Sequence, residues 1–439
     1  MSYEPQSILI SKNVALAANK QNAYQTPVAA AAYVSRPRTP GTSFASITPT
    51  FYSDEQLSNK GHQFPTTKQR TMQATTFDGT WDVDNFLAGW LFAFAMGADT
   101  VTGAGPYTHL FKFLQSSNQM PVTSLLHQDT NDVWYQLPDM AINDLQISGK
   151  ESGPLSAQFK MVGSGKNVDG QVALPAISIP QFIFGSDTDV LIGPGAPDPT
   201  LFTLATQAGG TQAARTDYFK FTYTSAAGET VASSEVSIAV PLNSVAKVTA
   251  PAAFPPGVTS CTVYASTSTG TETKQQAGIA AAGTYTEPNT GFAAGAALPT
   301  GTSALSSIKE RVKQWAVHLV MDMQTNRAPG GGFFGTFTKV LKQRANLQMQ
   351  VAAKDVDDLR TLFVGDTPRN IQLKANSGAA QQLTLDFPYV MPVAPAATAS
   401  GVEILWPITV GDQDALRWQG QEIFTATVVN NVASYLTGA

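Results

Sequence analysis

Alternation of apolar and polar side chains is the dominant pattern in this chain, and it predicts β-strands. In WAVHLVMDM, which begins at Trp315, every second residue is a bulky apolar one, and this period of two buries one face of a strand. Residues 347–351 alternate with glutamine in the same way. Residues 145–159 and 371–387 alternate on both sides of a Ser-Gly pair, so each predicts a β-hairpin with one buried face.

The stretch WDVDNFLAGWLFAFAMG, residues 81–97, has apolar residues at helical spacing instead. Its apolar run is well short of the roughly 20 residues that cross a bilayer, so it predicts a packed helix of three turns. Asp82 and Asp84 precede it as N-cap candidates, because acidic side chains bind the free N–H groups of a first turn, and Gly97 follows it as a helix-ending residue. The residues on the buried face are Phe86, Leu87, Trp90, Leu91 and Phe94.

The outer parts of the chain resemble two copies of one unit. KQR at Lys68 leads to DVDNFLAGWL, and KQR at Lys342 leads to DVDDLRTLF at nearly the same separation. In the second copy, Asp355 and Asp357 are the N-cap candidates of another short helix. The paired acidic residues would also suit a general acid and base, but capping explains both copies at once. We therefore predict two tandem units, each with strands, one short helix and one of the two hairpins.

The middle of the chain differs from the two outer parts in its composition. Residues 196–304 are nearly devoid of charge and are flanked by GPGAPDPT and ALPTGTSALSS, which suit linkers. Short strands at roughly ten-residue spacing predict a small β-sandwich, with Cys261 buried inside one strand. The chain thus divides into residues 1–195, 196–304 and 305–439.

Composition excludes several classes of protein. Only 13% of the 439 residues are charged and the net charge is −5, whereas a general nucleic-acid binder normally has a basic patch. The single cysteine excludes an intrachain disulfide framework. MSYEPQSILISKN lacks the basic and apolar parts of a signal peptide, so we expect synthesis in a cytoplasm, no export by the general secretory route and no membrane insertion.

Candidate catalytic and metal-binding residues are few. The four histidines are His62, His109, His127 and His318. They show no HExxH or i, i+4 pairing, so structural roles are predicted and no metal site. The Gly-rich stretches 163–170 and 328–337 lack the strand–loop–helix context of a phosphate loop. No nucleophile, base and orienting group can be assembled from spacing, so we predict no enzyme, no catalytic residue and no cofactor.

The second Gly-rich stretch, APGGGFFGTF, lies between two predicted strands. Its glycines favour a flexible loop, and aromatic side chains on such a loop are suited to docking onto another subunit. We predict an inter-subunit contact made by Gly330, Gly331, Gly332, Phe333, Phe334 and Phe337.

Several of these segments resemble the major tail tube proteins of long-tailed double-stranded DNA bacteriophages. The resemblance rests on the helix followed by GPYTHLFKF and MPVTSLL, on INDLQISGKESGPLSAQFKMVGSG, and on the C-terminal TATVVNNVASYL. The middle region, with GETVASSE, VYASTSTG and TYTEPNTG, is similar to Ig-like or fibronectin-type-III-like insertions of phage virion proteins. The resemblance covers most of the chain in order, through diffuse β patterns without an invariant signature.

The resemblance implies a structural protein of the virion tail, made in the bacterial cytoplasm. Tube proteins form rings whose inner wall is a β-barrel shared by all subunits, and the rings stack into a hollow tube through which genome DNA passes without specific binding. Members with one unit form hexamers, and members with two form trimers that imitate a hexamer, so duplication favours a trimer. The implied partners are further copies of the chain and the tape measure, tail terminator and baseplate or tail tip proteins.

The implied fold class is mainly β: two tail-tube-type β-sandwich or barrel units with one short helix each, and an inserted Ig-like β-sandwich outside the tube. Segments 37–73 and 325–339 would be loops that reach the next ring. Residues 1–25 and 430–439 would be arms that contact other subunits.

Two other functions fit the same patterns. One is a different virion component with an Ig-like module, such as a capsid-decorating, sheath or baseplate protein. The other is a glycan-binding adhesin that uses the aromatic residues of the middle region, which are Tyr218, Tyr223, Tyr264 and Tyr285.

Overall fold

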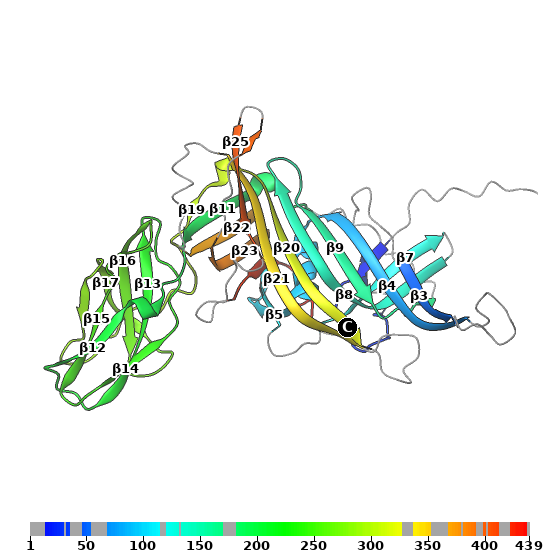
Figure 1. The fold of residues 1–439 in the computed structure, drawn as a ribbon. Helices are drawn as coiled ribbons and strands as arrows, with labels where there is room; N and C mark the ends of the chain where they lie inside the picture. Colours follow the sequence, from blue (N-terminus) through cyan, green and yellow to red (C-terminus); the bar gives the residue numbers. More distant parts are fainter. Residues whose placement is uncertain are drawn as a thin grey trace, which may run out of the picture.

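The fold is mainly β, as predicted from the sequence. The computed structural model describes residues 14–29, 32–35, 46–53, 68–114, 120–130, 133–169, 181–326, 337–352, 368–378, 381–391, 398–400, 403–411 and 422–436. Within these ranges, antiparallel strands build four sheets, and α1 (Asn85–Met96) is the α-helix among them (Figure 1). No helix in the described ranges has the length and apolar character that a membrane span requires.

The largest sheet contains a continuous run of strands that we call the main sheet. Every neighbouring pair in it is antiparallel. In spatial order it consists of β3 (Ser46–Ser53), β4 (Lys68–Asp82), β9 (Ser156–Gly163), β8 (Val133–Lys150), β20 (Val312–Asn326), β21 (Phe337–Ala352), β25 (Glu403–Val410) and β24 (Thr398–Ser400).

The first half of β8 also carries a side branch, which includes part of the predicted N-terminal arm. The branch consists of β7 (Thr123–Thr130), β1 (Val14–Ala17), β2 (Tyr33–Ser35) and β10 (Val168–Asp169). All four residues of β1 are buried, and β1 pairs with β2 on one side and β7 on the other. Residues 14–17 of the predicted arm are therefore a buried strand of the chain's own sheet, and residues 1–13 lie outside the described ranges; contact of this segment with other subunits stays a prediction.

A second sheet packs against the main sheet and joins the two ends of the sequence. It consists of β19 (Ser306–Ser307), β11 (Thr188–Pro194), β22 (Arg369–Gly378), β23 (Gln381–Val390), β26 (Thr425–Asn430), β6 (Tyr107–Phe113) and β5 (Gly97–Thr102). The outer segments of the chain share one hydrophobic core, which runs from Val14 to Tyr435. We call these two sheets, their side branch and α1 the body.

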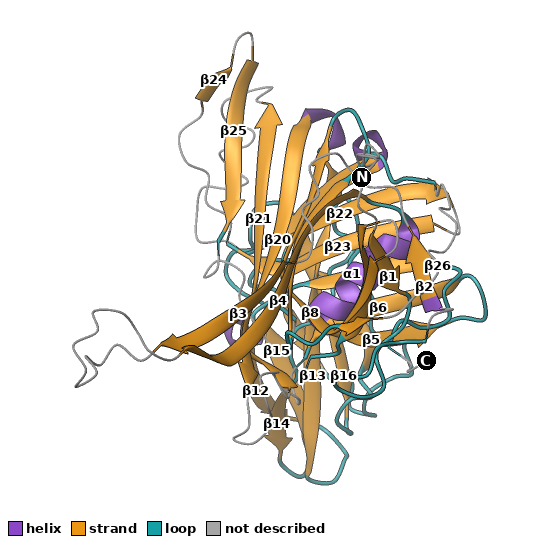
Figure 2. Cartoon of the chain, turned by 90° about the vertical axis from the view of Figure 1, so that its right-hand side faces the viewer, coloured by secondary structure: helices purple, strands orange, loops and turns teal. Residues whose placement is uncertain are grey.

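The helix α1 lies between the two sheets. It contacts β8 of the main sheet and β26 and β6 of the second sheet (Figure 2). The indole N–H of Trp90 donates to the Ala17 carbonyl at 2.7 Å. All its side chains except Phe86 are buried, as an all-round apolar sequence requires.

The ends of α1 are set by one carboxylate and one glycine. The Asp84 side chain accepts hydrogen bonds from the N–H groups of Phe86 and Leu87, and Gly97 ends the helix in the left-handed conformation, with φ of 86°. The prediction that Asp82 also caps the helix is wrong. Asp82 is the last residue of β4, where it pairs with Ser156.

The two predicted hairpins occupy different sheets. β8 and β9 lie in the main sheet, whereas β22 and β23 lie in the second sheet, so their expected equivalence is wrong. Hairpins β3–β4 and β20–β21 do lie in the same sheet. Alternation specifies a buried face but not the sheet that the face covers, and the duplication stays a prediction.

Residues 196–304, which we call the central module, form a two-sheet sandwich around a separate core that includes Cys261. One sheet consists of β12 (Thr203–Ala208), β15 (Ser244–Thr249) and β18 (Thr284–Thr286), and the other of β14 (Val236–Val240), β13 (Arg215–Ser225), β16 (Val258–Ser266) and β17 (Thr273–Ile279). The chain leaves the second sheet after β11 and returns in β19, which pairs with β11. Figure 1 shows the module, in green, to one side of the body. The short 3-10 helices are η2 (Gly185–Asp187), η3 (Pro199–Leu201) and η4 (Lys309–Arg311).

The C-terminal segment is fastened to its own chain as far as Leu436. Tyr435 is fully buried, and the ring nitrogens of His109 lie 2.9 Å from Asp99 Oδ2 and 2.7 Å from the Val432 carbonyl oxygen. Residues 430–436 of the predicted arm are thus packed on their own chain, and residues 437–439 lie outside the described ranges; contact of this segment with other subunits stays a prediction.

Candidate assembly surface

The main sheet has one covered face and one open face. Its covered face packs on α1 and the second sheet through the apolar set that alternation predicts. These buried residues include Trp81, Leu145, Phe159, Trp315 and Leu347. The open face carries the intervening positions, and a depression of about 530 Å³ lies over it. Glutamine is the commonest side chain around this depression, at Gln146, Gln158, Gln314, Gln348 and Gln350.

Charges on the open face are balanced across neighbouring strands. Arg344 on β21 donates to Asp322 on β20 at 2.9 Å, and His318 Nε2 lies 3.1 Å from Asp144 Oδ1. Asp144 also stands opposite Lys160 in the register of β8 and β9. Among the described side chains, the acidic ones on this face are Asp78, Asp82, Asp144 and Asp322, and the basic ones are Lys150, Lys160, Lys342 and Arg344.

The middle of the main sheet joins the two outer segments of the chain without a break. β8 and β20 pair from Lys150–Gln314 to Asp144–Val320. At this joint the indole of Trp315 covers Gly149, where an added Cβ would lie within 2.8 Å of three indole atoms. The joint is thus closely packed, and the open face continues across it.

The main sheet ends at two strands whose outer sides have no partner in the described part of the chain. These are β3 at one end and β25 with the short β24 at the other. Because seven successive antiparallel steps separate them, β3 and β24 run in opposite directions. Unpaired strand edges are ready templates for pairing with another chain.

The predicted loop between subunits lies mostly outside the described ranges. Gly330, Gly331, Gly332, Phe333 and Phe334 fall there, and so do Asp355 and Asp357 of the second predicted helix. Phe337 is the first residue of β21 and pairs with Asn326, so the loop leaves from the end of the β20–β21 hairpin. Segment 37–73 is not one long loop, because it contains β3 and the start of β4.

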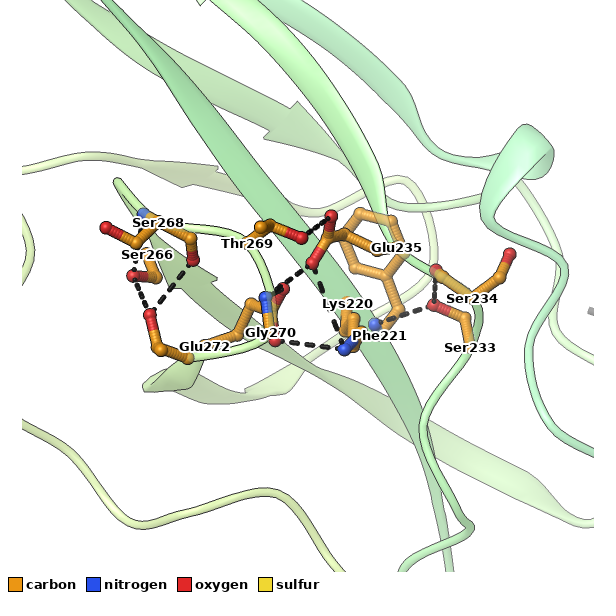
Figure 3. A network of polar contacts seen from close by, with 11 residues as sticks. Lys220, Phe221, Ser233, Ser234, Glu235, Ser266, Ser268, Thr269, Gly270 and Glu272 are labelled. Carbon is orange, nitrogen blue, oxygen red and sulfur yellow. Dashed lines mark hydrogen bonds and ion pairs between the residues drawn. The ribbon is translucent and has the colours of Figure 1, made fainter. Parts of the chain in front are cut away.

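The central module contains a compact polar network at one end (Figure 3). Lys220 Nζ lies 3.0 Å from Glu272 and 4.0 Å from Glu235, and the Gly270 N–H donates to both carboxylates. The hydrogen bond between Glu235 and Glu272 lowers the pKa of Glu235 to about 2, and the hydrogen bonds from Thr269 and Gly270 to Glu235 act in the same direction. The lysine fills the space between the carboxylates, so the network ties a loop to β13.

The described residues hold no cluster of three or more His, Cys, Asp or Glu side chains that would bind a metal ion. His109 and His318 each contact an aspartate of their own sheet instead. Comparison with models of known protein families finds no match, and comparison with curated protein sequences finds none either. The open face and the edges of the main sheet are the chain's candidate assembly surfaces. Sequence reasoning missed the edges, because strand order is decided by long-range pairing.

Proposed function

We propose that this chain is a tail tube protein of a long-tailed double-stranded DNA bacteriophage. Copies would pair edge to edge through β3 of one copy and β24–β25 of the next, and close the main sheet into a barrel around a bore. The observation that carries the proposal is an antiparallel main sheet with a neutral polar face and opposed open edges. The sequence resemblance supports the same function.

Strand direction supports a ring. Because β3 and β24 run in opposite directions, a copy related by simple rotation presents β3 antiparallel to β24. The antiparallel order of the main sheet then continues across every seam, by which we mean the contact between β3 of one copy and β24–β25 of the next. A head-to-tail contact of this kind closes into a ring when the rotation allows it, and closure satisfies every edge.

The position of the second layer supports the assignment of the bore to the open face. The covered face already carries α1 and the second sheet, whose bulk does not fit inside a narrow barrel. The central module leaves from β11 and β19 of the second sheet, so it would stand on the outside of the tube.

The size of the bore favours three copies per ring. Three copies supply 24 strands, and with strands about 4.8 Å apart and tilted by about 40° the backbone radius is roughly 24 Å. Side chains take about 5 Å of that radius, which leaves a bore roughly 40 Å wide. Two copies would leave only about 20 Å, the width of a B-form duplex itself, and six would leave more than about 80 Å.

The chemistry of the open face suits passage of DNA without retention. Affinity for DNA comes mainly from lysine and arginine on phosphates. Among the described side chains of the open face, the four lysines and arginines are offset by four aspartates, and glutamines surround the central depression. In this function the tape measure, tail terminator and baseplate or tail tip proteins are the partners, and the virion tail is the location.

Electron microscopy of the purified protein combined with thiol labelling tests the proposal. Cys261 is buried, so Gln348→Cys on the open face and Gln207→Cys on the module each provide one accessible thiol. We expect tubes of uniform bore in which both thiols react with a small maleimide, while a maleimide on a bulky polymer reaches position 207 alone. Discs alone, or monomers at every concentration up to the solubility limit, would contradict the tube, and polymer labelling at 348 would contradict the assignment of the bore.

A further inference from the structure

The open edges of the main sheet carry features that weaken strand pairing. Pro49 lies within β3, opposite Gln73 of β4, and Pro407 lies within β25, opposite Gln350 of β21. Proline has no backbone N–H and is therefore disfavoured inside sheets, except at bulges and in edge strands where its nitrogen is turned to the unpaired side. Each edge strand thus lacks one hydrogen-bond donor toward a neighbouring copy.

Two further features at the same edges have the same effect. The register of β3 and β4 shifts between Thr50 and Phe51, next to Pro49, and such a bulge twists an edge strand. At the other end, β24 has only three residues, and in the described part of the chain it covers β25 only as far as Leu405, which leaves Pro407 without a described neighbour on that side. Prolines, bulges and short strands are the means by which β proteins prevent edge-to-edge aggregation.

We propose that Pro49 and Pro407 keep free copies of this chain from pairing, so that seams close only where a copy gains two seams and a stacking contact at once, at the end of a growing tube. This inference rests on the proposed function. Its chemistry is specific: at each seam two main-chain donors are missing, one from β3 and one from β25. One seam alone is too weak to hold two copies together, and a completed ring is held by all its seams and by its neighbours.

The matched variants restore the missing donors. Pro49→Thr and Pro407→Thr each add an N–H and a residue with high strand propensity. Pro288→Thr is the control, because Pro288 is exposed in a loop of the central module and far from either edge in the fold. Thermal unfolding of each protein checks that the body and module still fold.

Sedimentation velocity of the full chain over a concentration series measures self-association, and electron microscopy identifies the product. We expect wild type and Pro288→Thr to remain monomeric at concentrations at which the Pro49→Thr, Pro407→Thr double variant assembles. The threshold concentration should fall roughly tenfold for each restored donor, as one hydrogen bond per seam implies.

The outcomes separate this inference from the proposed function. Tubes that form at the same concentration in wild type and double variant would overturn the role of the prolines and leave the tube function standing. Open sheets or fibres formed only by the double variant, with no tubes from either protein, would support the prolines as edge protection and overturn the tube function.

Discussion

The hydroxyl group of Tyr435 donates a hydrogen bond of 3.1 Å to the backbone carbonyl of Phe86, and the ring lies directly against Gly89. A Cβ added at Gly89 would lie within 2.6 Å of two ring carbons of Tyr435. Both groups are buried, so the contact cannot be relieved by a small shift into solvent. We expect Gly89→Ala to destabilise the body by about 1–3 kcal/mol, as overpacking of a core does. Urea unfolding followed by tryptophan fluorescence measures this, because all six tryptophans lie outside the central module.

Removal of Tyr435 provides the control for this prediction. Alanine stabilises a helix interior relative to glycine by roughly 0.5–1 kcal/mol when no clash opposes it. In a Tyr435→Ala background, Gly89→Ala should therefore be neutral or stabilising. An equal loss of stability in both backgrounds would show that the ring is not the cause.

The pair of His109 and Asp99 predicts a dependence of body stability on pH. Both partners of His109, Asp99 and the Val432 carbonyl, are acceptors, so both ring nitrogens donate and the ring is a cation. Burial by itself would lower the pKa of His109, but the hydrogen bonds to Asp99 and to the Val432 carbonyl raise it above its ordinary value. Since the folded pKa is the higher one, the stabilisation is complete below about pH 6.5 and is lost as the pH rises through the folded pKa.

The measurement is the free energy of unfolding of the body between pH 6 and pH 9, again by tryptophan fluorescence. We expect a decline in wild type and a flatter profile in Asp99→Asn, in which the charge that favours the cation is gone. Asp187→Asn, at an exposed position of η2, should keep the wild-type profile. A wild-type profile that is already flat over this range would contradict the cationic pair.

Asp217 predicts a second pH dependence, confined to the central module. Its side chain is fully buried beside Arg215 and Glu287, and its Oδ2 atom has no hydrogen-bond partner. Burial, with the negative charge of Glu287 adding to it, raises the pKa of Asp217 to about 6, although Arg215 opposes the shift. The unfolded chain ionises near pH 4 and the folded module near pH 6, so the module loses up to about 3 kcal/mol as the pH rises through this window.

Cys261 reports the opening of the module, because it is the chain's single thiol and lies in the module core. Its rate of reaction with a pyridyl disulfide, in moderate denaturant, should rise between pH 4 and pH 7 by more than its own ionisation accounts for. Asp217→Asn keeps an acceptor for Arg215 and removes the buried charge. We expect the variant to match wild type at pH 4 and to be protected at pH 7; lower protection at pH 7 would show that the ionised Asp217 is stabilising.

Alternation was sufficient to predict the strands of the long hairpins and their buried faces, because burial of one face imposes the period of two directly, as at Trp315 and Leu347; it did not predict β1, which lies in the predicted arm. The N-cap of α1 could not be assigned from the sequence, because Asp82 and Asp84 are chemically equivalent. Asp82 is excluded as the cap only by the pairing of β4 with β9, which places Asp82 opposite Ser156. The same limit applies to Pro49 and Pro407, since a proline in a strand pattern indicates an edge only once the order of strands is known. Pairing between strands distant in the sequence thus determines the cap residue and the edge strands, which the local sequence pattern does not specify.

The proposed bore predicts how added positive charge changes retention of DNA. Gln348 lies on the open face among neutral side chains, so Gln348→Lys would place an unmatched cation in every subunit around the bore. We expect tubes of this variant to retain fluorescent double-stranded DNA after washing at low salt, and wild-type tubes to retain none. Retention should fall steeply with salt, because each lysine–phosphate contact contributes a slope of about −0.9 to the dependence of log affinity on log salt. Gln207→Lys adds the same charge on the exposed β12 of the module and should bind DNA only at the outer surface, where nuclease removes it. Nuclease-sensitive DNA on both variants alike would place position 348 outside the tube.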